Sequence, residues 1–399
     1  MDRSRIDGLL QEAVTYGAVP GVVAVVGDRD GVLYEGAFGR LAQDGEGLVL
    51  PDTMMRLASM TKPIVCVGAL QLIEQGDIAL EQPVRDILPS FGELPVLGGF
   101  DGEKPRLRAP VRQATIRDLL THTSGLGYWF VNADVLRYQR LTGIPDPSRG
   151  LLAAFGMPLI ADPGTRWEYG TSIDWLGLVV EEVSGQDLPT YCGERVFAPL
   201  GMIDATFRPS DGQRARMMAL HARLPDGSLA RSAMEFPAQP EFWSGGSGAY
   251  ATARDYLRFL RALLRGGELD GERVLRSETV ELIFTDHLDG IPWPAAMRSE
   301  VPELSNSVPS VPFGHGFGLG LHLVLRDLPR MRRAGTGDGS GLFNCYYWID
   351  RTTGVAGALF TQVLPFFDER IVERLVGFEV ATYASVAAAA HRPTSSAGG

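Results

Sequence analysis

A serine and a lysine three residues apart carry the strongest chemical signal in the sequence. Ser59 and Lys62 begin an apolar run with helical periodicity that ends near Gly76. Residues i and i+3 share one face of a helix, so Lys62 can reach the Ser59 hydroxyl. A serine becomes a good nucleophile when a neighbouring base takes its proton, and a lysine can be that base. The spacing therefore predicts a nucleophile at Ser59 and a proton-transfer group at Lys62.

The alternative for this pair is a helix-capping serine followed by a solvated lysine. The chain holds only two lysines, Lys62 and Lys104, against 35 arginines. An ordinary surface cation would usually be an arginine in such a chain. Because an arginine does not give up its proton, a role in proton transfer would explain a lysine at position 62.

A serine nucleophile needs a second proton carrier and an oxyanion hole. Tyr169, on a loop before the amphipathic run 172–185, is the candidate carrier. The alternative is an aromatic side chain that only packs its loop against Trp167. For the oxyanion hole, one backbone N–H comes from Ser59 itself. The glycine-rich segment 335–341 is the candidate second donor, and its alternative is a flexible turn.

Two histidines are further candidates for catalytic groups. His122 and His315 could belong to a Ser-His-Asp triad, but the chain has no Gly-x-Ser-x-Gly elbow. Neither histidine is spaced with a carboxylate as a metal-binding pair would be. We expect each to hold its own loop by a backbone hydrogen bond.

Composition limits the class of protein and of partner. The 399 residues carry a formal net charge of −11, with 45% hydrophobic residues, which is typical of a soluble globular protein. The acidic balance argues against nucleic acid or an anionic membrane as partner. Cys66, Cys192 and Cys345 are predicted to be buried thiols rather than disulfides. With no signal-peptide core at the N-terminus, we expect a cytoplasmic protein; the oligomeric state is not predicted.

The elements that must position these residues come from both ends of the chain. A first amphipathic helix precedes a hairpin formed by residues 22–26 and 32–38. Near the C-terminus, strands 343–349 and 355–360 precede a helix that starts at Asp368. The pattern predicts one antiparallel sheet built from both chain ends and flanked by helices, with a mainly helical lobe inserted between them.

The predicted lobes have explicit boundaries. Residues 1–86 and 300–386 form a discontinuous α/β lobe, residues 87–299 form the helical lobe, and residues 387–399 form a disordered tail. Capping patterns at Thr115 and Thr252 predict two helices of the inserted lobe. Residues 87–113 and 288–314, which are rich in Pro and Gly, are predicted to be long loops.

The order of the motifs resembles that of the penicillin-binding and class C β-lactamase superfamily. The residues within and around the motifs resemble the family VIII carboxylesterases more closely. The similarity covers roughly residues 5–385. Besides the Ser59 segment, the segments that resemble the family are 119–129, 163–169, 245–248 and 346–350. The resemblance implies a β-lactamase-like α/β fold and an acyl-enzyme on Ser59, with Lys62 and Tyr169 sharing proton transfer.

The same resemblance implies further site residues. The third motif aligns with Gly339-Ser340-Gly341, so Leu342 would supply the second oxyanion N–H, and Tyr128 and Trp129 would line the acyl or alcohol pocket. No metal or organic cofactor is implied. Two departures stand out: Tyr169-Gly170-Thr171 lacks the asparagine of β-lactamases, and the third motif lacks its cationic or aromatic first residue. We therefore do not expect strong β-lactamase activity.

The sequence thus predicts a serine hydrolase acting on small carboxylic esters. A transacylase, or an amide or peptide hydrolase, would use the same acyl-enzyme. A protein that binds an acyl group or another ligand without turnover is a further alternative, because the third motif is altered.

Overall fold

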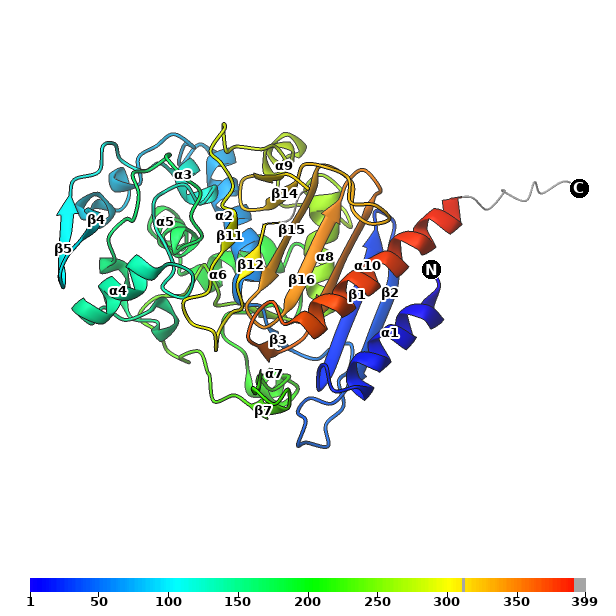
Figure 1. Ribbon diagram of the computed structural model, residues 1–399. Coiled ribbons are helices and arrows are strands. Elements are labelled where there is room, and N and C mark those ends of the chain that lie inside the picture. The colour runs from blue at the N-terminus through cyan, green and yellow to red at the C-terminus, as the bar shows by residue number, and fades with distance from the viewer. Residues whose placement is uncertain (311–312, 391–399) are drawn as a thin grey trace, which may run out of the picture.

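A seven-stranded antiparallel sheet forms the centre of the computed structural model, which describes residues 1–310 and 313–390 (Figure 1). Its strands come from both ends of the chain, as predicted. In spatial order they are β13 (His315–Phe317), β14 (His322–Val324), β15 (Thr336–Gly341), β16 (Cys345–Asp350), β17 (Val355–Phe360), β1 (Gly21–Asp28) and β2 (Val32–Gly39).

Strand β1 shows how helices cover both faces of this sheet. Val22, Ala24 and Val26 pack on one face with the terminal helices α1 (Arg3–Thr15) and α10 (Glu369–Ala390). Val23 and Val25 point the other way, into the large core that includes α8 (Ala253–Leu264). Because successive residues of a strand face opposite sides, a strand buried on both faces is apolar throughout.

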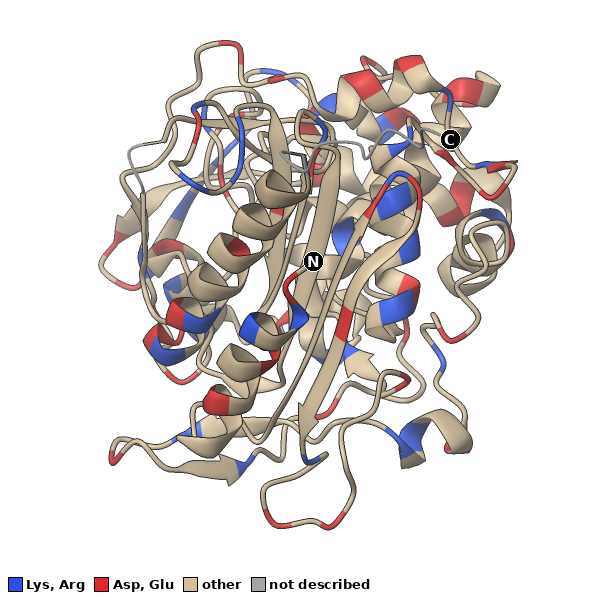
Figure 2. Ribbon diagram, turned by 90° about the vertical axis from the view of Figure 1, so that its right-hand side faces the viewer, with Lys and Arg blue, Asp and Glu red and all other residues tan. Residues whose placement is uncertain are grey.

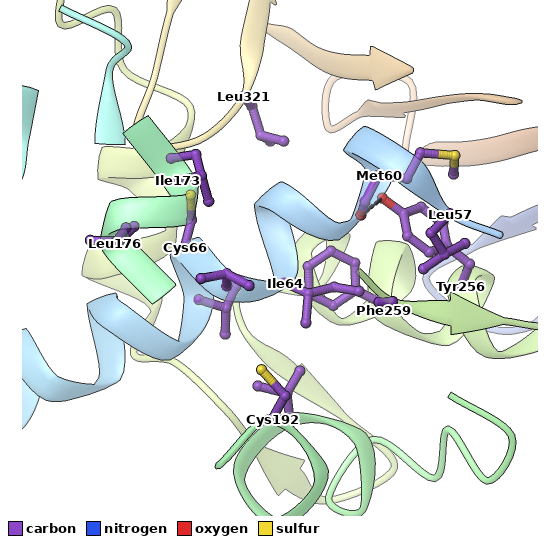
Figure 3. Close-up of a cluster of buried hydrophobic side chains, with 14 of the residues drawn as sticks. Leu57, Met60, Ile64, Cys66, Ile173, Leu176, Cys192, Tyr256, Phe259 and Leu321 are labelled. Atoms are coloured by element: carbon purple, nitrogen blue, oxygen red, sulfur yellow. Dashed lines mark hydrogen bonds between the residues drawn. The ribbon is translucent and has the colours of Figure 1, made fainter. Parts of the chain in front are cut away.

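Helix α2 (Lys62–Gln75) runs from the sheet into the inserted segment and is buried along most of its length. Figure 3 shows Ile64 and Cys66 of α2 among side chains from α5 (Ser172–Ser184) and α8. A helix that is apolar all round belongs in a core. The helix ends at Gly76, which has a left-handed φ of 83°.

Short elements make up the rest of the described chain. The remaining helices are α3 (Ile116–Leu120), α4 (Ala133–Thr142), α6 (Leu188–Cys192), α7 (Asp211–Ala215) and α9 (Ser277–Ile283). The small sheets pair β3 (Met55–Arg56) with β8 (Tyr250–Ala251), β4 (Val96–Asp101) with β5 (Lys104–Arg108), β9 (Glu268–Leu269) with β10 (Glu272–Arg273), and β11 (Ala296–Met297) with β12 (Val308–Pro309). A last one joins β6 (His221–Arg223), β7 (Leu229–Arg231) and β18 (Val363–Leu364).

Several local predictions are confirmed. The hairpin β1–β2, the capping box at Thr115, the side-chain cap at Thr252 and the stop at Gly185 are all present. All three cysteines are free and buried, and burial raises the pKa of each thiol. The lobe boundaries at 86/87 and 299/300 stay predictions.

Three expectations are corrected. The predicted loop 87–113 contains the hairpin β4–β5, whose exposed side chains show no apolar alternation, and the loop 288–314 contains β11 and β12. Residues 387–390 of the predicted tail belong to α10, since alanines extend a helix readily; residues 391–399 lie outside the described part. For the glycine-rich segment, the alternative of a flexible turn is wrong, because residues 336–341 form strand β15, which pairs with β16.

Charge is distributed without a dominant sign in the view of Figure 2, where acidic and basic positions are interspersed along the helices. Within the described residues, no helix is both long and apolar enough to cross a membrane.

Candidate active site

Ser59 lies on a 3-10 turn, η1 (Ala58–Thr61), just ahead of α2 rather than at its start. Ala58, before it, has a positive φ of 46°, a backbone conformation that a non-glycine residue adopts at a cost of about 1–3 kcal/mol. The turn is held by two contacts from distant segments. Leu57 N–H donates to Ala249 O at 3.0 Å, and the Tyr256 hydroxyl donates to Met60 O at 3.0 Å. Such anchoring keeps the half-buried Ser59 hydroxyl in one place.

Lys62 opens α2 and is buried, with 6% of its surface exposed, whereas Lys104 on β5 is exposed. Its Nζ donates to Ser59 Oγ at 3.1 Å and to Gly246 O at 2.8 Å. The interpretation of Lys62 as a solvated surface cation is therefore wrong. The sequence did not predict the Gly246 carbonyl, which lies almost two hundred residues further along the chain.

Tyr169 completes the group around the serine. Its hydroxyl donates to Ser59 Oγ at 2.6 Å, and Lys62 Nζ lies 4.8 Å from the centre of its ring. The Tyr169 loop is held by backbone bonds to another loop: Glu168 N–H donates to His122 O at 2.9 Å and Tyr128 N–H to Tyr169 O at 3.1 Å. The nucleophile turn with α2, the Tyr169 loop and the loop 122–128 thus bring Ser59, Lys62 and Tyr169 together.

The two candidate histidines lie in different surroundings. The backbone of His122 does hold the two loops together, but its buried Nδ1 has no hydrogen-bond partner among the described residues. Burial, with a smaller contribution from the Lys62 charge, lowers the pKa of His122 well below its usual range, so the ring is neutral. His315 contacts a second histidine: its Nδ1 lies 2.8 Å from His322 Nε2.

Strand β15 brings the third motif against the nucleophile turn. A Cβ on Gly341 would lie 2.4 Å from Leu57 O, so only a glycine allows this approach. Leu342 follows in the turn between β15 and β16 and, with Ser340, lines the same cavity as Ser59. The backbone N–H groups of Ser59 and Leu342 have no backbone partner within the described residues.

The unusual first residue of that motif, Gly339, has a steric explanation. Gly339 pairs with Tyr347 of β16, and a Cβ at position 339 would lie 2.6 Å from the Tyr347 hydroxyl. Tyr347 therefore occupies the space that a larger side chain at position 339 would need. The cavity wall here is a tyrosine from the neighbouring strand instead of a cation.

A cavity of about 420 Å³ opens from Ser59 along this wall, a size suited to a drug-sized ligand. Its lining is mainly apolar and aromatic: Phe130, Trp167, Trp293, Phe317, Tyr346 and Phe366 contribute, Trp293 from the segment 288–314. Phe130 and Val131 take the lining places expected of Tyr128 and Trp129. The Tyr128 hydroxyl donates to Asp174 at 3.0 Å, and Trp129 packs in a separate apolar cluster with Val135.

About 10 Å along β15 from Gly341, the cavity lining carries a group of charges that the sequence did not predict. We call this region the Arg332 end of the cavity, and the region around Ser59 the Ser59 end. Arg332 forms ion pairs with Asp338 and Glu379, and His322 Nδ1 lies 2.6 Å from Asp338 Oδ1. All four residues line the cavity. The only signal in the sequence was Asp338 within the glycine-rich segment, because its partners lie on β14, on α10 and in the loop before β15.

Comparisons with known proteins identify the family of the chain. The β-lactamase family model matches residues 6–382. A monacolin J acid methylbutanoyltransferase from Aspergillus terreus is 33% identical, covering 94% of this chain and 94% of its own. A lovastatin esterase from Penicillium rubens is 32% identical over 90% of this chain and 93% of its own.

Among solved structures, unliganded simvastatin synthase from Aspergillus terreus is similar, with a TM-score of 0.81 and 30% identity. The similarity covers 96% of this chain and 99% of that one. The match spans the sheet, the inserted helices and the segments that hold Ser59, Lys62 and Tyr169. The chain belongs to the β-lactamase family of serine enzymes.

Proposed function

We propose that this protein transfers the acyl group of a carboxylic ester to Ser59 and then releases it to water, as an esterase. The observation that carries the proposal is the hydroxyl of Ser59 held between Tyr169 Oη at 2.6 Å and Lys62 Nζ at 3.1 Å in the lining of a mainly apolar cavity. A serine hydroxyl in contact with two groups that can exchange protons, beside an open cavity, is arranged for nucleophilic attack.

In the first half of the reaction, the Ser59 oxygen attacks the ester carbonyl while its proton passes to Tyr169 in its phenolate form or to Lys62 in its neutral amine form. In the Tyr169 route, a charged Lys62 stabilises the phenolate or the alkoxide beside it. In the Lys62 route, the amine becomes the ammonium group when it accepts the proton. The carbonyl oxygen would receive the N–H groups of Ser59 and Leu342, and the leaving alcohol would take the proton back. In the second half, water attacks the acyl carbonyl and the same groups return Ser59 to its starting state.

Transfer of the acyl group to an alcohol is the second candidate. Relatives that are 32–33% identical over 83–94% of this chain are named methylbutanoyltransferase or acyltransferase. The apolar lining of the cavity also suits an alcohol of some bulk, which would exclude water from the acyl-enzyme. For either acceptor, the cavity favours an ester with a bulky apolar group over a small charged one.

An intact-mass time course with a short-chain nitrophenyl ester tests the proposal. We expect repeated release of nitrophenol, a transient acyl adduct on Ser59, and loss of both in Ser59→Ala. An unchanged turnover in Ser59→Ala would refute the proposal. A stoichiometric burst with a lasting adduct would indicate an acyl-binding protein without turnover.

Adding an apolar secondary alcohol to the same assay separates the two acceptors. New ester at the expense of free acid would assign the transferase. Free acid alone, at every alcohol concentration, would assign the hydrolase.

A further inference from the structure

The segment Gly245-Gly246-Ser247-Gly248 is one of those that resemble the family, but its sequence alone assigns it no role. In the structure its Gly246 carbonyl accepts a hydrogen bond from Lys62 Nζ at 2.8 Å. Lys62 therefore has two acceptors, Gly246 O and Ser59 Oγ. The position of Gly246 decides where the ammonium group can sit.

A buried carboxylate holds Gly246 in place. Asp174, only 1% exposed, lies in the first turn of α5, where the helix dipole favours a negative charge. Its Oδ1 accepts the Gly246 N–H at 3.0 Å and the Ser244 hydroxyl at 2.6 Å. Its Oδ2 accepts the Tyr128 hydroxyl at 3.0 Å.

The fit between these groups requires glycine at position 246. A Cβ there would lie 2.5 Å from Asp174 Oδ2 and 2.7 Å from the Tyr128 hydroxyl oxygen. Tyr128 in turn places its ring 5.2 Å from Lys62 Nζ, within reach of a cation–π attraction. Asp174 thus reaches Lys62 by two routes, through the Gly246 backbone and through the Tyr128 ring.

The charges around Lys62 single out Asp174 as its counter-charge. Within the described residues, Lys62 contacts Ser59 Oγ, the Gly246 carbonyl and the rings of Tyr128 and Tyr169, and none of these contacts is with a carboxylate. Of the titratable groups that face it, His122 is neutral because burial lowers its pKa, and Cys66 keeps its proton because burial raises its pKa. Burial and Asp174 likewise raise the pKa of Tyr128 well above its usual range. Apart from Tyr169, the proposed proton carrier, this leaves Asp174 as the anion of the cluster.

We propose that Asp174 is a positioning residue for acyl transfer, which orients Lys62 toward Ser59 and supplies its counter-charge without contacting it. A direct ion pair would compete with Ser59 for the ammonium protons. A carboxylate that acts through Gly246 and Tyr128 orients the amine and leaves it free to exchange a proton with the serine. This inference rests on the proposed acyl-enzyme function.

Asp174→Asn tests the charge at nearly constant size. We expect kcat/KM for the nitrophenyl ester to fall on the order of 10–100-fold, because small misplacements of a catalytic group have effects of this size, with KM little changed. Removing the negative charge also favours the neutral amine. The acidic limb of the pH–activity profile should therefore move to lower pH, by about half a unit to one unit.

Asp350 provides a matched control. It is fully buried and accepts the Tyr383 hydroxyl at 3.0 Å, the Thr353 hydroxyl at 2.8 Å and two backbone N–H groups. It lies at the end of β16 away from the β15–β16 turn, about 17 Å along the strand from Cys345. We expect Asp350→Asn to lower the melting temperature and to leave the acidic limb in place.

Ser244→Ala keeps the proposal testable if Asp174→Asn folds poorly. It removes one hydrogen bond to Asp174 but keeps the charge. We expect kcat to fall a few-fold with KM and the acidic limb unchanged.

The inference would be overturned if Asp174→Asn showed wild-type kinetics per folded molecule. If Asp174→Asn does not fold, wild-type kinetics in Ser244→Ala would overturn it. So would a shift of the acidic limb that Asp350→Asn reproduces. The Ser59→Ala variant separates the two proposals. If Ser59→Ala stays active, the proposed function fails. If Ser59→Ala is inactive while Asp174→Asn resembles the wild type, only the role of Asp174 fails.

Discussion

The Ser59 end and the Arg332 end of the cavity each contain a cation that is largely shielded from solvent, but the two cations are held differently. At one end, Lys62 donates to a serine hydroxyl and a backbone carbonyl, both neutral. At the other end, Arg332 is neutralised by Asp338 and Glu379, and His322 also contacts Asp338. A cation paired with carboxylates contributes shape and stability, whereas a cation held by neutral acceptors can still exchange its proton. The comparison predicts activity losses at the first end and stability losses at the second.

The largest effect is expected from Lys62→Arg, which keeps the positive charge but cannot accept a proton. We expect kcat/KM for a nitrophenyl ester to fall about 1,000-fold or more if this residue transfers the proton. Lys104→Arg is the matched control, since Lys104 is exposed on β5, and it should keep the wild-type rate. A Lys62→Arg enzyme within tenfold of the wild type would show that a fixed charge is sufficient at this end.

Tyr169→Phe removes the hydroxyl that lies 2.6 Å from Ser59 Oγ. We expect kcat/KM to fall on the order of 100-fold or more, as for the loss of a general acid–base group. The control is Tyr191→Phe, whose buried hydroxyl donates to Gly68 O at 3.2 Å within the helical core. If both variants lose activity equally, Tyr169 has a packing role only.

At the other end of the cavity, Arg332→Met leaves Asp338 and Glu379 without their shared cation. We expect the free energy of unfolding to fall by about 3–5 kcal/mol, because an unpaired buried charge is costly. Urea denaturation measures this, with Arg333→Met as control. The Arg333–Asp327 pair is exposed on both sides and should change stability by less than about 0.5 kcal/mol. Similar losses in both variants would contradict the contrast between the two ends.

The smallest effect concerns pH. Burial raises the pKa of Asp338, but the contributions of His322 and Arg332 outweigh it and hold the pKa below its usual value of 3.8. Below that value the unfolded chain binds more protons than the folded one, so this stabilisation is present above pH 4 and is lost as the pH falls. Urea midpoints between pH 6 and 3 should fall less steeply in Asp338→Asn than in the wild type. Equal slopes would mean that Asp338 is not held ionised by its partners.

Local patterns carried most of the fold prediction. The β1–β2 hairpin, the caps at Thr115 and Thr252 and the stop at Gly185 depend on neighbours within a few residues, and the structure contains all of them. The β4–β5 hairpin was missed because its exposed side chains show no apolar alternation. Strand β15 was missed because glycines carry no side-chain periodicity, and its pairing partners are set by the sheet.

The sequence by itself determined the contact between Ser59 and Lys62, since an i, i+3 spacing across one helical turn brings two side chains together wherever that turn lies. Only the tertiary structure decided what surrounds the pair. Gly246 and Asp174 approach Lys62 from segments more than a hundred residues away, and Tyr347 fills the space above Gly339 from a neighbouring strand. Contacts between distant segments depend on how helices pack on the sheet, which no local spacing records.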